Sequence, residues 1–101
     1  MSEELPSPQM ALKFLSQSGC SRRVIAHCKA VAALAVQIAE ACKRKGLNVD
    51  IKLVEVGALL HDIGRSKTHS VHHALVGGEI AIALGLPKSV ARIIERHVGG
   101  G

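Results

Sequence analysis

The chain has 101 residues, which is enough for one small domain with a single hydrophobic core. Apolar residues make up 48% of it and aromatic residues only 1%, so the composition favours packed helices over a β-sandwich and argues against base stacking on aromatic side chains. The formal net charge of +5 comes from bases spread along the chain, and most of these fit solvated helix surfaces and helix ends.

The three cysteines, Cys20, Cys28 and Cys42, are odd in number and widely spaced. They form no C-x-x-C pair, so the sequence predicts neither a zinc knuckle nor a disulfide framework. No uninterrupted apolar run reaches the roughly 18 residues of a membrane span, and no charged-then-apolar signal peptide opens the chain. We therefore expect a cytoplasmic protein with no membrane partner.

Two helices are predicted in the first half of the chain. After a loose segment over residues 1–7, Ser7-Pro8 predicts a helix start, and Gly19 is expected to end that helix. Ser21 can cap a second helix that runs to about Lys45. Its predicted inward stripe consists of Val24, His27 or Cys28, Val31, Leu34 or Ala35, Ile38 and Cys42.

The spacing predicts three further helices, over about residues 51–61, 70–84 and 87–97. Asp50 is a strong cap for the first of these, and Gly64 is expected to end it. Residues 65–69 are expected to form a polar loop. Because no alternating strand pattern and no internal repeat appear, the predicted fold class is an all-α bundle of about five helices.

The most informative stretch is Gly57–Arg65, where an apolar helical run ends in His61-Asp62 and a glycine and a base follow. An unpaired polar group in a buried place costs on the order of 2–7 kcal/mol, so both side chains need partners. A divalent cation is a natural partner, because imidazole and carboxylate groups are common metal ligands. A metal needs more than two protein ligands, so further ligands are expected elsewhere in the chain.

Three other histidines fall on predicted inward faces. His27 shares a helix face with Val31, and His73 and His97 lie on the apolar stripes of the last two helices. Each one alone is more often a core histidine that is hydrogen-bonded to a carbonyl group. Together with His61-Asp62 they favour one shared metal centre, because a single centre satisfies all of them. The signal is weaker for His69 and His72.

The order His27, His61-Asp62-Ile63-Gly64, His73 and His97 resembles the HD-domain superfamily of metal-dependent phosphohydrolases, and most of all its small HDIG-type members. The resemblance covers about residues 20–101. It implies that His27, His61 and Asp62 hold one divalent metal and that His73 and His97 serve a second. The sequence does not distinguish Mn, Fe, Ni, Co, Zn and Mg.

One departure from the family's pattern concerns its late aspartate, which lies beyond the position matched by His97 and has no counterpart here. Asp50 is the only other aspartate in the chain, and it is needed as a helix cap. We therefore expect residues 1–101 to be a single HD-like domain that forms the N-terminal part of a longer one, with water or a partner chain supplying a metal ligand.

The family resemblance implies hydrolysis of a phosphate ester. A metal would polarise the phosphoryl oxygens and acidify a water molecule, with Asp62 and His61 as the catalytic residues. Arg65 and Lys67 could neutralise the phosphate, although a plain basic loop is an equally good interpretation. The pair Arg22-Arg23, one turn before His27, could line the same opening.

Function is therefore predicted as metal-dependent hydrolysis of a small-molecule phosphate ester, with a nucleotide as the expected substrate. The alternative is a catalytically weak or inactive regulatory module that binds a metal or a nucleotide. Nucleic-acid binding ranks last, because no aromatic platform and no recognised motif supports it. Apolar surface around Val90, Ile93 and Ile94 predicts self-association as a homodimer.

Overall fold

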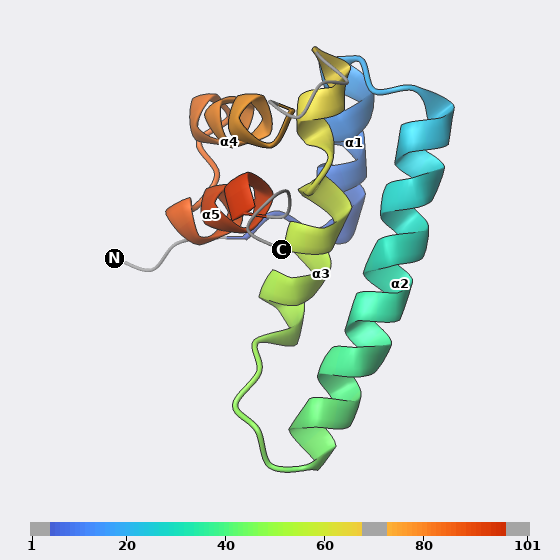
Figure 1. The fold of residues 1–101 in the computed structure, drawn as a ribbon, viewed down its shortest axis with the longest axis vertical. Helices are drawn as coiled ribbons and strands as arrows, with labels where there is room; N and C mark the ends of the chain where they lie inside the picture. The colour runs from blue at the N-terminus through green and yellow to red at the C-terminus, as the bar shows by residue number, and fades with distance from the viewer. Residues whose placement is uncertain (1–4, 68–72, 97–101) are drawn as a thin grey trace.

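The computed structural model describes residues 5–67 and 73–96. The elements are α1 (Pro8–Ser18), α2 (Arg22–Arg44), α3 (Ile51–Leu60), a 3₁₀ helix η1 (Ile63–Ser66), α4 (His73–Ala83) and α5 (Lys88–Arg96). No strand occurs in the described part of the chain, and every labelled element in Figure 1 is a helix. The predicted all-α bundle of five helices is confirmed.

The helix starts follow from local capping chemistry. Ser7 Oγ accepts a hydrogen bond from the Met10 backbone N–H, and Ser21 and Asp50 cap α2 and α3 in the same way. Such a bond satisfies one of the backbone donors that a helix leaves unpaired in its first turn. At the other end of α1, Gly19 takes a left-handed conformation with φ of 98°, which residues with a Cβ rarely adopt.

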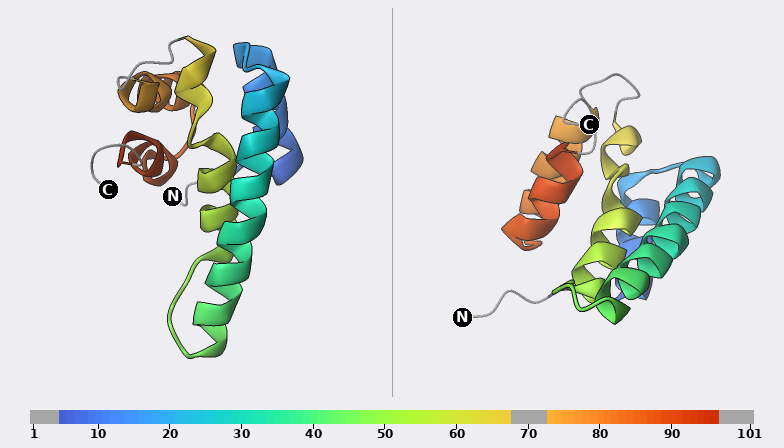
Figure 2. Two further views of the ribbon diagram at one scale, coloured as in Figure 1. Left: turned by 45° about the vertical axis from the view of Figure 1, so that its right-hand side comes forward. Right: turned by 60° about the horizontal axis from the view of Figure 1, so that its bottom comes forward.

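Helix α3 is the central element of the bundle. It packs against α2 on one side and against α1 and α5 on others, while α4 rests on α5 and η1 (Figures 1 and 2). Val56 and Leu60 of α3 are completely buried. The other fully buried apolar side chains are Ala11, Leu15, Cys28, Ile63, Ala81, Val90 and Ile94.

The inward stripe predicted for α2 is wrong for two of its large apolar residues. Leu34 and Ile38 are 59% and 57% exposed, and the buried face consists of Val24 and three smaller residues. These smaller residues are Cys28, Ala32 and Ala39. The small side chains let α3 pack closely, so its own large apolar side chains fill the interface instead.

The prediction of an exposed apolar surface on α5 is also wrong. Val90 and Ile94 are completely buried, and Ile93 packs over Gly57, which has no side chain to keep α5 away. The most exposed large apolar side chains of the described helices lie instead on α2 and on α4, where Leu75 and Ile82 are more than half exposed. Self-association stays a prediction, and α2 and α4 are the helices whose exposed faces can support it.

The connection after α3 differs from the expected helix end and loop. Helix α3 ends at Leu60, and Gly64 and Arg65 lie within η1. Gly64 does not take the left-handed conformation of a helix-ending glycine, which is found at Gly19, Gly46 and Gly85. It is needed for a different reason, because a Cβ on Gly64 would meet the backbone carbonyl of His73 at the start of α4.

Helix α2 also meets the length and composition of a membrane span, the one helix in the described residues that does so. The sequence reading missed this because it counted uninterrupted apolar runs, and the helix contains scattered charges. Core helices of soluble proteins meet the same criterion, and α2 buries one face against α3. The absence of a membrane partner stays a prediction.

Candidate metal centre

Asp62 lies where the chain passes from α3 to η1, and only 2% of the residue is exposed. The buried thiol of Cys28 on α2 lies near the backbone of Asp62. Burial, followed by the negative charge of Asp62, raises the pKa of this thiol to about 12. Cys28 therefore lies beside Asp62 as a neutral thiol.

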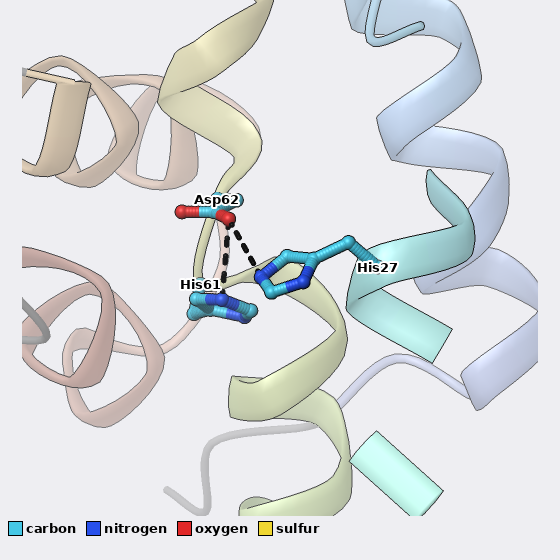
Figure 3. Close-up of side chains that lie close together, drawn as sticks. All are labelled: His27, His61 and Asp62. Carbon is cyan, nitrogen blue, oxygen red and sulfur yellow. Dashed lines mark ion pairs between the residues drawn. The ribbon is translucent and has the colours of Figure 1, made fainter. Parts of the chain in front are cut away.

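Two histidines approach the same oxygen of Asp62 from different helices. The distance from His27 Nε2 to Asp62 Oδ2 is 3.3 Å, and the distance from His61 Nε2 to this oxygen is also 3.3 Å. Figure 3 shows His27 reaching from α2 toward the side chains at the end of α3. The ligand atoms of all three residues lie within 4.8 Å of one another.

This arrangement fits a divalent metal ion. Ligand atoms about 2.0–2.2 Å from a metal lie roughly 3.0–3.5 Å from one another, which agrees with the two 3.3 Å separations. The side chain of His61 is 12% exposed and that of His27 is 54% exposed, so the group is buried on one side and open on the other. Together they form a candidate His-His-Asp metal site with room for further ligands from solvent or substrate.

The carbonyl group of Ala58 orients His61. It accepts a hydrogen bond from Nδ1 of His61, which leaves Nε2 directed at Asp62. A backbone partner on one ring nitrogen is the usual way to fix the other nitrogen for a metal. When His61 is neutral and protonated on Nδ1, its Nε2 lone pair faces a carboxylate oxygen, and a cation between the two atoms removes the repulsion.

Without a metal, a proton on Nε2 of His61 removes the repulsion between this nitrogen and the carboxylate oxygen of Asp62. Burial lowers the pKa of His61, but hydrogen bonds to Asp62 and to the Ala58 carbonyl raise it by more, so the net pKa lies above the ordinary value of 6.5. A pKa that is raised in the folded state adds stability below about pH 6.5, and this contribution disappears as the pH rises through the folded-state pKa.

We therefore expect the stability of metal-free protein to fall as the pH rises above about 6.5, and the stabilisation by added Zn²⁺ or Mn²⁺ to grow as it does so. The metal and the proton compete for the same nitrogen, so the metal binds more tightly at higher pH, where less of the imidazole is protonated. Thermal unfolding after EDTA treatment, with and without metal, measures both effects. The His61→Gln variant should lose both pH dependences, and an unchanged profile in it would contradict this account.

Two further residues contact Asp62. His73, the first residue of α4, is buried, and its Nε2 lies 3.2 Å from the second oxygen, Oδ1. Arg65 Nε lies 3.3 Å from Oδ2 as an ion pair without the alignment of a hydrogen bond. Asp62 thus contacts both histidines of the first predicted metal set and His73, the described member of the second. His97, the other member of the second set, lies outside the described residues, as do His69 and His72.

A pocket of about 240 Å³ opens beside the His-His-Asp group. The side chains that line it are Arg23, Val24, His27, Asp62 and Arg65. Of the two residues predicted to bind phosphate, Arg65 lines this pocket, whereas Lys67 is exposed and is not among the lining residues. Of the pair at the start of α2, the lining contains Arg23 and not Arg22.

The sequence reading missed that Ala58 and Cys28 lie at the site. Ala58 lies three residues before His61, so a histidine that turns back to a carbonyl near the end of its own helix could have been foreseen. The contact between Cys28 and Asp62 joins positions 34 residues apart in the sequence, and nothing local in the sequence predicts it.

Comparisons with known proteins indicate the family of this chain. A family model described as the HD domain matches residues 24–101. The chain is 51% identical over 82 residues to an uncharacterized protein of Methanocaldococcus jannaschii, covering 81% of this chain and 48% of that protein. It is 43% identical over 97 residues to a tRNA (cytidine(56)-2'-O)-methyltransferase of Thermoplasma volcanium, covering 96% of this chain and 27% of that enzyme.

A shorter match is with a ribonuclease Y of Acidothermus cellulolyticus, which is 47% identical over 53 residues, covering 50% of this chain and 11% of the enzyme. No solved structure matches the chain. The chain spans about half the length of the first of these relatives and about a quarter of the second. The family match extends over 78 of the 101 residues and includes all the predicted metal ligands, so the chain belongs to the HD domain family.

Proposed function

We propose that this domain is a metal-dependent phosphohydrolase that cleaves a phosphate ester of a nucleotide or a related small molecule. The observation that carries the proposal is the buried carboxylate of Asp62, approached at 3.3 Å by histidines from two helices beside an open pocket. HD domains are typically phosphohydrolases of this kind, and the His-His-Asp group is present here.

The proposed metal ligands are His27, His61 and Asp62, with His73 and His97 available to a second ion. A divalent ion in this place would polarise a phosphoryl oxygen and make a water molecule more acidic. Asp62 is the residue suited to orient the attacking water, because it is buried and its carboxylate is held by four neighbouring side chains. His61 would share this catalytic task.

The identity of the metal follows only in part from the ligand types. Imidazole and carboxylate groups suit Mn, Fe, Co, Ni and Zn, and Mg is held less well by imidazole. A set of two histidines and one carboxylate leaves coordination positions open, which is typical of catalytic rather than structural metal sites.

The alternative function is a regulatory module that binds a metal or a nucleotide without efficient turnover. In the described residues, Asp62 is the only carboxylate of the candidate metal group. A site with a single carboxylate would hold its metal more weakly than one with two, and this favours the alternative wherever no other chain supplies an oxygen ligand.

Two measurements test the proposal. Protein purified without a histidine tag should contain about one transition-metal ion per chain, and its thermal stability should rise when Mn²⁺, Ni²⁺ or Zn²⁺ is added to the metal-free form. A panel of nucleotides, generic phosphodiesters and short RNA oligonucleotides then separates an enzyme from a binding module. Metal-free protein whose stability ignores all three ions would remove the metal site, and metal-loaded protein without hydrolysis would favour the regulatory module.

A cytoplasmic location, the lack of a membrane partner and homodimer formation remain proposals of the same kind. The short RNA oligonucleotides belong in the panel because two relatives carry names that refer to RNA, a tRNA methyltransferase and a ribonuclease. We still rank nucleic acid below small molecules, because the chain has no Trp or Tyr and Phe14 is not among the described residues that line the pocket.

A further inference from the structure

We infer that Arg23 binds the phosphate group of the substrate and that the pocket prefers a terminal phosphate, a phosphomonoester, to a phosphodiester. The inference rests on the proposed function and deepens it by naming a specificity-determining residue and a substrate class. It starts from the lining of the pocket, where Arg23 and Arg65 accompany His27 and Asp62.

Arg23 reaches this pocket because of its place on α2. It precedes His27 by four residues, and side chains four apart in a helix lie on the same face. Arg22 precedes His27 by five residues and therefore projects in another direction. The pocket is thus bordered by one guanidinium group from the first turn of α2 and another from η1, and the His-His-Asp group lies beside them.

The charges of the lining favour a doubly negative group. Arg23 and Arg65 carry two positive charges, Asp62 carries one negative charge, and Arg65 is already paired with Asp62 at 3.3 Å. None of the ion pairs found among the described residues includes Arg23, so its charge is available to a ligand. A divalent ion would add to this positive excess. A phosphomonoester carries a charge of about −1.5 to −2 at pH 7, whereas a diester carries only one negative charge.

The size of the pocket also favours a small terminal phosphate group. Its volume of about 240 Å³ is below the roughly 300–1,000 Å³ of sites that enclose a drug-sized ligand. It can enclose a phosphate group and the atoms next to it, while a larger substrate would extend into solvent. Arginine suits this task, because its planar fork of donors matches two oxygens of one phosphate.

Methyl phosphate and dimethyl phosphate are the probes that test the inference, because they differ by one methyl group and one ionisable oxygen. Their binding is measured by calorimetry or ³¹P NMR at pH 8, with metal-free and with Mn²⁺-loaded protein. We expect methyl phosphate to bind at least about tenfold more tightly, and Arg23→Gln to weaken its binding about 10- to 100-fold. Arg23→Lys should lie between the two, because lysine keeps the charge and loses the fork.

Arg22→Gln is the matched control, since it removes the same charge from the same helix end outside the pocket. Equal losses in the two variants would reduce Arg23 to a contributor to general positive charge and overturn the inference. Equal binding of the two probes, or no binding of methyl phosphate to either form, would also overturn it. Because the metal-free form is measured too, these outcomes are independent of whether the protein hydrolyses any substrate.

Discussion

Replacement of Asp62 by asparagine is expected to abolish metal binding and to lower any hydrolytic rate by more than about 100-fold. Changes that merely perturb the groups behind a metal ligand cost 10- to 100-fold, and Asp62 is proposed as a ligand itself. The amide has no negative charge, and it would place a donor group among the histidine and arginine nitrogens that now surround the carboxylate. Metal analysis and the rate on the best substrate of the panel measure the two effects.

Asp50→Asn provides a control with the same chemical change at the only other aspartate in the chain. Asp50 caps α3 by accepting the Leu53 backbone N–H, and asparagine caps helices about equally well. Metal content and rate should therefore match the unmodified protein. A rate within about tenfold of normal in Asp62→Asn would refute the role assigned to this residue, and an equal loss in Asp50→Asn would trace the effect to the fold.

Gly64→Ala is expected to destabilise the protein by at least about 3 kcal/mol, more than most single substitutions. An added Cβ would overlap the carbonyl oxygen of His73 and lie 2.8 Å from the backbone nitrogen of Gly77. Both neighbours are backbone atoms of α4, so the helix as a whole must move. Because His73 contacts Asp62, that movement would also disturb the metal centre. Urea unfolding followed by circular dichroism measures the loss.

Gly78→Ala, at a buried glycine of α4 that faces α5, is the comparison. A Cβ there would meet the side chain of Glu95, which is flexible and can turn away. Alanine also favours a helix by about 1 kcal/mol over glycine, so the net change should stay within about 1 kcal/mol. If Gly64→Ala were as mild as Gly78→Ala, the close approach of η1 and α4 would not be essential to the fold.

The sequence by itself determined the features that depend on neighbouring residues. Serine and aspartate caps and stopping glycines act within one helix turn, so the starts of α1, α2 and α3 could be predicted closely. The pair His61-Asp62 could be singled out because two polar groups at the end of an apolar helix need partners. The family could be predicted from the same few residues, and the match over residues 24–101 confirms it.

Only the tertiary structure decided which residues meet. Helical periodicity marks an apolar stripe on α2 but does not say whether Leu34 or Ala32 faces α3, since that depends on how closely the neighbouring helix packs. Likewise, two adjacent arginines look equivalent in a sequence. The orientation of α2 about its axis decides that Arg23, and not Arg22, lines the pocket beside the metal centre. In the sequence Gly64 looks like a glycine that ends a helix. In the structure its lack of a side chain lets the backbone of α4 pack against it, and this contact joins residues that are separated in the sequence.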